Sequence, residues 1–265
     1  MRDTPREDLA GSGYAPVNGL RMYYEVHGEG GDQGPTRPLV LLHGGLLTID
    51  LSFGPVLPEL AAGRQVIAAE LQGHGRTADI ERDIDLSVLA SDVAGLLDHL
   101  GVGQADVLGF SLGGGVALQL TLDRPDRVGR LIAVSVSYAG DGFHPEISDP
   151  AQHATSTRMP TEEDFRQMRE AYERLAPDPG HFEVFAAKTS QAANTLRGWT
   201  AAELGSITAP TLLVFGDHDF IRLEHAVRMH ELITGAQLAV LPGATHMGVL
   251  RRADLIVPLV AGFLG

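Results

Sequence analysis

The stretch ADVLGFSLGGGVALQLTL, residues 105–122, decides the fold. Its first six residues are mostly apolar, as in strands that are buried on both faces of a parallel sheet, and the residues from 112 onward have a helical pattern. The motif Gly-x-Ser-x-Gly at 109–113 joins the two. A sharp strand-to-helix turn strains its central residue and exposes the side chain at the edge of the sheet. The pattern therefore predicts that Ser111 is a nucleophile.

Glycines surround Ser111 at the point where the strand and the helix must pass close to each other. Gly109 and Gly113 meet that demand, and Gly114 and Gly115 allow a still closer approach. A dinucleotide-binding Gly-x-Gly-x-x-Gly turn is excluded, because Ser111 occupies its second glycine position. The alternative role that the sequence leaves open for Ser111 is to cap the helix that follows.

A serine hydroxyl needs a base within hydrogen-bond reach, and the base needs an orienting acid. Two predicted strands in the last quarter of the chain are followed by Asp219 and by His246. Ligands bind beyond the carboxyl ends of such strands, so we predict His246 as the base and Asp219 as the acid. Asp217, which could instead cap the loop, and Asp141 are alternative acids. A metal site at 217–219 is disfavoured, because no other ligand cluster has metal-binding spacing.

Acyl transfer places negative charge on the former carbonyl oxygen, and two backbone N–H groups can stabilise it. One donor is expected from Leu112, directly after the nucleophile. The second is expected from the glycine loop after the first buried strand, where we assign Gly45 and keep Leu46 as the alternative.

Four other histidines receive structural interpretations. His43 is expected to pack beneath the loop that it begins, and His74, between two glycines, to be a turn residue. His225 and His230 fall on a predicted helix and are expected at the surface.

Strand and helix signals alternate along most of the chain. Asn18-Gly19 predicts a type I′ hairpin within residues 14–26, and Asp85 and Gly101 are start and stop signals for a helix. This alternation predicts a parallel sheet that is covered by helices on both faces. The predicted strands are at 39–42, 66–69, 105–110, 131–136, 211–215 and 237–241, and the helices are at 86–100, 112–122, 223–233 and 250–263.

Residues 137–206 interrupt the alternation. The segment contains five prolines and helical patterns near 161–175 and 182–195, and it has no clear strand. We interpret it as a helical cap over the end of the sheet, inserted into a core formed by residues 1–136 and 207–265. An ordinary long helical crossover is the alternative.

Composition excludes several classes of function. The 265 residues, 44% of them hydrophobic and 20% charged, can form a full globular core. The net charge of −14 argues against nucleic-acid and anionic-membrane partners. The absence of cysteine removes disulfides, zinc–thiolate sites and a cysteine nucleophile. The single lysine, Lys188, lacks the glycines of a P-loop. No signal peptide or transmembrane segment is apparent, so we expect a cytoplasmic protein.

Taken together, the motifs resemble the α/β-hydrolase superfamily. The matching pieces are LVLLHGG at 39–45, ELQGHGRT at 70–77, VLGFSLGGG at 107–115, PTLLVFGDHD at 210–219 and LPGATHMG at 241–248. The resemblance implies an α/β fold with an eight-stranded, mostly parallel sheet, an antiparallel second strand and a helical cap after strand six. It implies the triad Ser111, Asp219 and His246, with Leu112 and Gly45 at the oxyanion, and no cofactor. The chain looks most like the branch of small serine esterases, lactonases and perhydrolases.

The expected reaction is the hydrolysis of a small to medium hydrophobic ester through an acyl-enzyme. A lactonase, a hydrolase of carbon–carbon bonds with the same triad, and a ligand-binding receptor on this fold are the alternatives. The partner is a small-molecule ester, and a homodimer is a possible assembly. We predict that apolar residues of the cap and residues beside the motifs contact the substrate: Leu46, Phe110, Tyr138, Met159, Phe165, Met168, Phe185, Trp199 and Met247.

Overall fold

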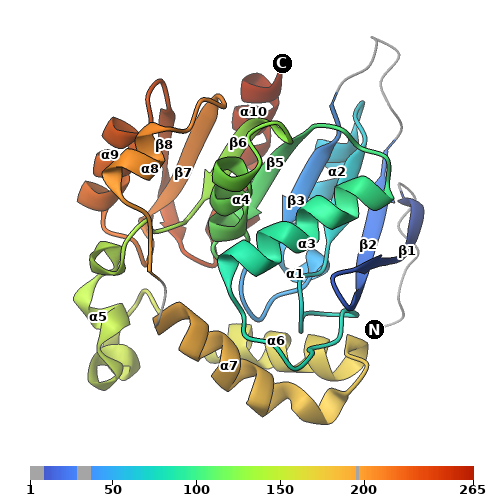
Figure 1. The fold of residues 1–265 in the computed structure, drawn as a ribbon. Helices are drawn as coiled ribbons and strands as arrows, with labels where there is room; N and C mark the ends of the chain where they lie inside the picture. Colours follow the sequence, from blue (N-terminus) through green and yellow to red (C-terminus); the bar gives the residue numbers. More distant parts are fainter. Residues whose placement is uncertain (1–8, 29–36, 195–196) are drawn as a thin grey trace.

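The computed structural model describes residues 9–28, 37–194 and 197–265. Its centre is an eight-stranded sheet in the order β1-β2-β4-β3-β5-β6-β7-β8 (Figure 1). β2 is antiparallel to both of its neighbours. The strands β4, β3, β5, β6, β7 and β8 are all parallel to one another, which confirms the predicted sheet. The strands are β1 (Leu9–Val17), β2 (Leu20–His27), β3 (Leu39–Leu42), β4 (Val66–Ala69), β5 (Ala105–Phe110), β6 (Val128–Val134), β7 (Thr211–His218) and β8 (Gln237–Thr245).

The central strands are apolar throughout because helices cover both of their faces. Along β3, Leu39 and Leu41 pack into one core cluster, while Val40 and Leu42 pack into the other. One face is covered by α3 (Leu86–His99), α4 (Leu112–Asp123), α8 (Ala201–Gly205) and α9 (Leu223–Leu232). The other face is covered by α1 (Ile49–Phe53), α2 (Leu57–Ala61) and α10 (Ala253–Leu264).

Two local sequence signals, one for a turn and one for the start of a helix, are found in the structure at the predicted positions. Asn18 and Gly19 both have positive φ, as a type I′ turn requires, and they join β1 to β2. The Asp85 carboxylate accepts hydrogen bonds from the N–H groups of Ser87 and Val88 and so begins α3.

Some boundaries differ from the predicted ones. β6 ends at Val134, because Ser135 adopts a left-handed backbone with φ 52°. β7 and β8 extend beyond their apolar runs to His218 and Thr245. The helices α1, α2 and α8 have five residues each, too few to produce a recognisable helical period.

Between β6 and β7 the described residues form helices and no strand element. These are α5 (Pro145–Ser148), α6 (Glu162–Leu175), α7 (Phe182–Asn194) and α8, with 3₁₀ turns before α5, between α5 and α6, and between α6 and α7. In Figure 1, α6 and α7 run across one end of the sheet. The predicted end of the second cap helix, residue 195, lies outside the described residues. None of the described helices is long and apolar enough to span a bilayer.

Candidate active site

Ser111 lies in the turn between β5 and α4, with a φ of 53°. A Cβ atom on Gly109 would lie 2.1 Å from the Gly113 carbonyl oxygen, and one on Gly113 would lie 2.1 Å from the Leu42 carbonyl oxygen. Only glycine fits at these two positions, as the motif predicts. Ser111 occupies the N-cap position of α4, but its side chain makes no capping hydrogen bond, which removes the helix-cap interpretation.

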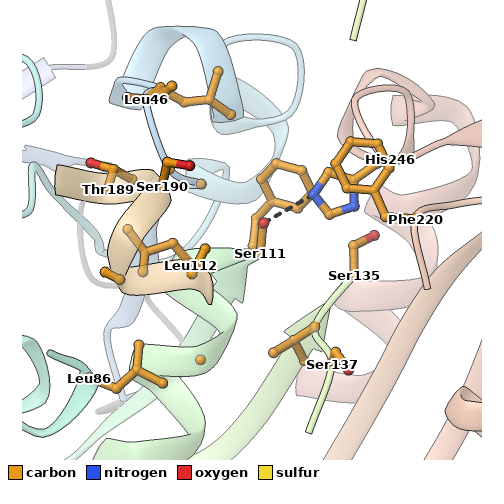
Figure 2. A pocket seen from close by; sticks show the side chains of 18 of the residues that line it. Leu46, Leu86, Ser111, Leu112, Ser135, Ser137, Thr189, Ser190, Phe220 and His246 are labelled. Carbon is orange, nitrogen blue, oxygen red and sulfur yellow. Dashed lines mark hydrogen bonds between the residues drawn. The ribbon is translucent and has the colours of Figure 1, made fainter. Parts of the chain in front are cut away.

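Three residues from distant parts of the sequence meet at this turn, and Figure 2 shows two of them, Ser111 and His246, with the hydrogen bond between them. The Ser111 Oγ is 3.0 Å from the His246 Nε2, and the His246 Nδ1 is 2.7 Å from the Asp219 Oδ1. Asp219 is fully buried, and His246 is 5% exposed. With Nδ1 protonated and facing the carboxylate, Nε2 is free to accept the serine proton.

The Asp219 carboxylate is held by several donors besides His246. Ser135 Oγ–H donates to Oδ2 at 2.5 Å, the Gly216 N–H donates to Oδ2 at 3.2 Å, and the Phe220 N–H donates to Oδ1 at 2.7 Å. Burial raises the pKa of Asp219, but the charge and hydrogen bond of His246, with those of Ser135 and Gly216, outweigh it. The pKa therefore lies below its ordinary value, and the group stays ionised.

The two alternative acids lie elsewhere. The Gly243 N–H and the His218 ring hold the pKa of Asp217 at about 2 by hydrogen bonding to its carboxylate, and the Ala244 N–H acts in the same direction. Asp217 lies in β7, and its hydrogen-bond partners are His218 and the backbone of β8 instead of His246. The Asp141 side chain is 81% exposed and lies 3.9 Å from His225. Among the residues that the structure describes, no cluster of three metal-ligand side chains occurs.

Leu46 cannot supply the second oxyanion donor, because its N–H already donates to the Nε2 of His74 at 3.0 Å. Leu46 has a φ of 60° and is held beside Gly45 by that bond. A Cβ placed on Gly45 would lie 3.9 Å from the Leu112 side chain, so the two expected donors belong to adjoining segments. The geometry thus leaves Gly45, with Leu112, as the candidate pair.

Two buried histidines brace residues 43–47, the candidate oxyanion loop. His43 Nδ1–H donates to the Gly44 carbonyl, and its Nε2 accepts from the Leu71 N–H. His74 Nδ1–H donates to the Gln72 carbonyl. Burial lowers the pKa of His43 to about 4, and burial lowers that of His74 well below 6.5, helped by the repulsion that would arise if both rings were protonated. Both rings are therefore neutral, and their hydrogen bonds set the tautomers.

Sequence reasoning missed three supporting residues. His74 is more than a turn residue, because it accepts the hydrogen bond that holds Leu46. The signal in the sequence was the pair of flanking glycines, Gly73 and Gly75, which mark an unusual backbone; both have positive φ in the structure. Phe220 stacks face to face on the His246 ring at 3.9 Å. The third, Ser135, carries no motif of its own.

A cavity of about 580 Å³ opens beside Ser111. Seven of the nine predicted contact residues line it, namely Leu46, Phe110, Met159, Phe165, Met168, Trp199 and Met247. Phe185 does not line it, because its ring is fully buried against His74 and Tyr172. Tyr138 does not line it either, because it stacks on His225 at 4.1 Å.

The expected surface position of His225 was wrong. Its side chain is buried, and Nε2 lies 3.0 Å from the Ser137 Oγ and accepts from the Tyr138 N–H. Ser137 and Tyr138, which follow β6, contact this ring and cover it. His230 is partly buried on the same helix.

Comparison with known proteins gives consistent matches. A sequence profile described as the alpha/beta hydrolase fold matches residues 37–180. A curated relative, the 2-hydroxymuconate semialdehyde hydrolase of Pseudomonas sp. (strain CF600), is 30% identical over 94% of this chain and 96% of its own length.

Two solved structures extend the likeness over nearly the whole chain. An N-acyl homoserine lactone degrading enzyme is 26% identical with a TM-score of 0.69, covering 94% of this chain and 99% of that one. A serine hydrolase involved in carbazole degradation is 18% identical with a TM-score of 0.78, covering 96% and 98%, and this second likeness concerns the fold alone.

Proposed function

The chain belongs to the α/β-hydrolase fold family, and from this premise we propose that it is a serine esterase acting on small to medium hydrophobic carboxylic esters. The observation that carries the proposal is the aligned set of Ser111, His246 and Asp219, with contacts of 3.0 and 2.7 Å. No cofactor is needed for the chemistry that this set can perform.

The reaction would run in two steps. His246 Nε2 takes the Ser111 proton while Oγ bonds to the ester carbonyl carbon, and the oxyanion binds the Leu112 and Gly45 N–H groups. The carbonyl re-forms, the bond to the alcohol oxygen breaks, and His246 returns the proton to that oxygen. Water then attacks the acyl-enzyme with the same base, releasing the acid and restoring Ser111.

The charges around Ser111 favour an ester over a dienoate, the kind of substrate implied by the names of the carbon–carbon hydrolases among the relatives. Among the described residues that line the cavity, the ionisable ones are Asp85, Arg197 and His246. The Arg197 side chain is 72% exposed and pairs with Glu203. A substrate carboxylate would find no buried cation there, and an unpaired buried charge is costly.

A panel of p-nitrophenyl esters tests the proposal. We expect turnover by the wild type and its loss in Ser111→Ala, with a fluorophosphonate probe labelling Ser111 in the wild type alone. Turnover that survives in Ser111→Ala would contradict the triad. Tight ligand binding without turnover would favour a receptor.

Carbon–carbon hydrolysis is the second candidate, favoured by the 30% identity to the semialdehyde hydrolase. A 2-hydroxy-6-oxo-dienoate assayed beside the esters separates the two. Because the cavity offers no buried cation among its described residues, we expect kcat/KM to be higher for the ester, and the reverse order would replace the proposed substrate class.

A further inference from the structure

We infer that Phe220 is a positioning residue for the catalytic base: its ring holds the plane of the His246 imidazole and stabilises the imidazolium that forms when Ser111 attacks. The inference rests on the triad of the proposed function and not on which ester the triad cleaves. It gives the phenyl ring a role beyond packing, because the electrons of its face contribute as well as its volume.

The rings of Phe220 and His246 lie face to face. Their centroids are 3.9 Å apart, and their planes differ by 5°. A second phenyl ring, that of Phe110, lies 5.1 Å from the imidazole at an angle of 38°. Figure 2 shows the Phe220 ring stacked on the imidazole, whose Nε2 points toward Ser111. The imidazole is therefore held on its face by a phenyl ring and on its edge by hydrogen bonds to Ser111 and Asp219.

The backbone of Phe220 fixes this ring relative to the acid. Its N–H donates to Asp219 Oδ1 at 2.7 Å, and the same oxygen contacts His246 Nδ1 at 2.7 Å. Its carbonyl oxygen accepts a hydrogen bond of 2.9 Å from the His144 N–H in the first part of the cap. The phenyl ring thus has a fixed position relative to both the acid and the base.

A stacked phenyl ring distinguishes the charged imidazole from the neutral one. The face of a phenyl ring carries negative partial charge and attracts a cation that lies over it. His246 becomes such a cation only when Nε2 takes the Ser111 proton, so the attraction is stronger in the transition state than in the resting enzyme. Water screens this attraction little, because His246 is 5% exposed. Phe220 should therefore raise kcat.

The other charges beside the triad are compatible with this role. The Asp219 carboxylate faces the edge of the imidazole and stabilises the same cation. Arg158 donates to the Asp219 carbonyl oxygen at 2.8 Å, but its guanidinium is paired with the Glu146 carboxylate at 2.8 Å. The positive charge of Arg158 is therefore balanced within the cap.

Fluorinated phenylalanines at position 220 separate the charge of the ring face from the volume of the ring. The 4-fluoro, 3,5-difluoro and 3,4,5-trifluoro analogues withdraw increasing electron density and change the size of the ring little. We expect kcat for p-nitrophenyl butyrate to fall along this series by about 5- to 30-fold in total, while KM changes by less than about threefold. Phe220→Leu should lower kcat at least as much, and Phe220→Tyr, which keeps an electron-rich ring, should retain most of it.

The trifluoro analogue at Phe263 is the matched control, because Phe263 is partly buried like Phe220 but lies in α10 and does not line the cavity. It should leave kcat unchanged. An equal kcat across the fluorinated series, with a loss only in Phe220→Leu, would leave Phe220 a packing role and overturn the inference. A change confined to KM would also overturn it, because Phe220 lines the cavity and would then act by contacting the substrate.

The rate at which a fluorophosphonate labels Ser111 measures the same activation without an ester. The bond from Oγ to phosphorus forms as His246 takes the serine proton and fluoride leaves, whatever the natural substrate is. We expect the labelling rate to fall in the same order as kcat. If the wild type turns over no ester but fluorination still slows labelling, the proposed substrate class fails and the role of Phe220 stands. If labelling is equally fast along the series, the inference fails and the esterase proposal is unaffected.

Discussion

At the scale of the residue, the question is which of two nearby aspartates, Asp219 or Asp217, is the acid that orients the His246 ring. Asp219 is buried against His246, whereas Asp217 lies in β7, is partly exposed and accepts a hydrogen bond from the Ala244 N–H. We expect Asp219→Asn to lower kcat by about 10³- to 10⁴-fold, because the amide favours the wrong imidazole tautomer. Asp217→Asn should stay within a few-fold of the wild type in the same steady-state assay. Equal losses would contradict the assignment.

Ser135 is predicted to act as a positioning residue through Asp219. Its hydroxyl bonds to the carboxylate oxygen that faces away from His246, from a left-handed backbone that only a well-braced residue adopts. Removing a hydrogen bond to a charged group should cost about 1.5–3 kcal/mol, which corresponds to roughly 10- to 100-fold in kcat if all of it appears in the transition state.

Ser135→Ala should therefore lower kcat while KM changes little, and Ser148→Ala, on the exposed α5, is the matched control. A fall in ester turnover seen only as a raised KM would mean that Ser135 contacts substrate instead.

At the scale of the element, α7 packs against both the candidate oxyanion loop and the His74 loop that braces it. Phe185 packs edge-on against His74 at 4.8 Å, and Thr189 lies 3.5 Å from the Cβ position of Gly45. The chain's one lysine, Lys188, donates to Asp79 at 2.7 Å, and His181 and Gln72 contact the same carboxylate. The packing position of α7 and the conformation of the candidate oxyanion loop are therefore coupled.

Lys188→Met should weaken that seating, because it leaves a largely buried carboxylate with fewer partners, at a cost on the order of 1–3 kcal/mol. We expect faster proteolysis within the cap and a lower kcat. Arg166→Met, which removes exposed ion pairs on α6, should change neither. An unchanged cleavage rate and kcat in Lys188→Met would show that α7 is seated by its apolar contacts alone.

The elements that could be predicted are those whose signals are local. The β5–α4 turn, the Asn18-Gly19 hairpin and the α3 cap each follow from a few adjacent residues. Asp219 could not be separated from Asp217 by spacing, because the register shift in the β7–β8 pairing between Gly216 and His218 determines where each side chain lies. Phe185 and Tyr138 were misplaced because an apolar cap residue can face either the cavity or the core.

At the scale of the whole molecule, acid should weaken the fold through its buried neutral histidines. The folded pKa of His43 is depressed to about 4, so between about pH 6.5 and 4 the unfolded chain binds a proton that the folded chain does not. The free energy of unfolding is therefore not reduced by His43 above about pH 6.5. It falls by on the order of 3 kcal/mol as the pH is lowered to about 4. The depressed pKa of His74 adds a loss of the same sign.

Urea unfolding at pH 7.0, 6.0 and 5.0 measures this slope. His99→Gln, which changes an exposed histidine, should leave it unchanged. A free energy of unfolding that is constant from pH 7 to pH 5 would contradict the prediction.

The glycine packing at the elbow has a consequence for folding. Gly113 donates to the His43 carbonyl and fits only against the backbone of Leu42, so the strained turn depends on β3 being in register beside β5. These strands are more than sixty residues apart in the sequence. An incomplete or half-collapsed chain thus cannot hold an activated serine, and nucleophilic reactivity should emerge only with the last cooperative step of assembly. A nascent copy on the ribosome would be chemically inert toward its neighbours.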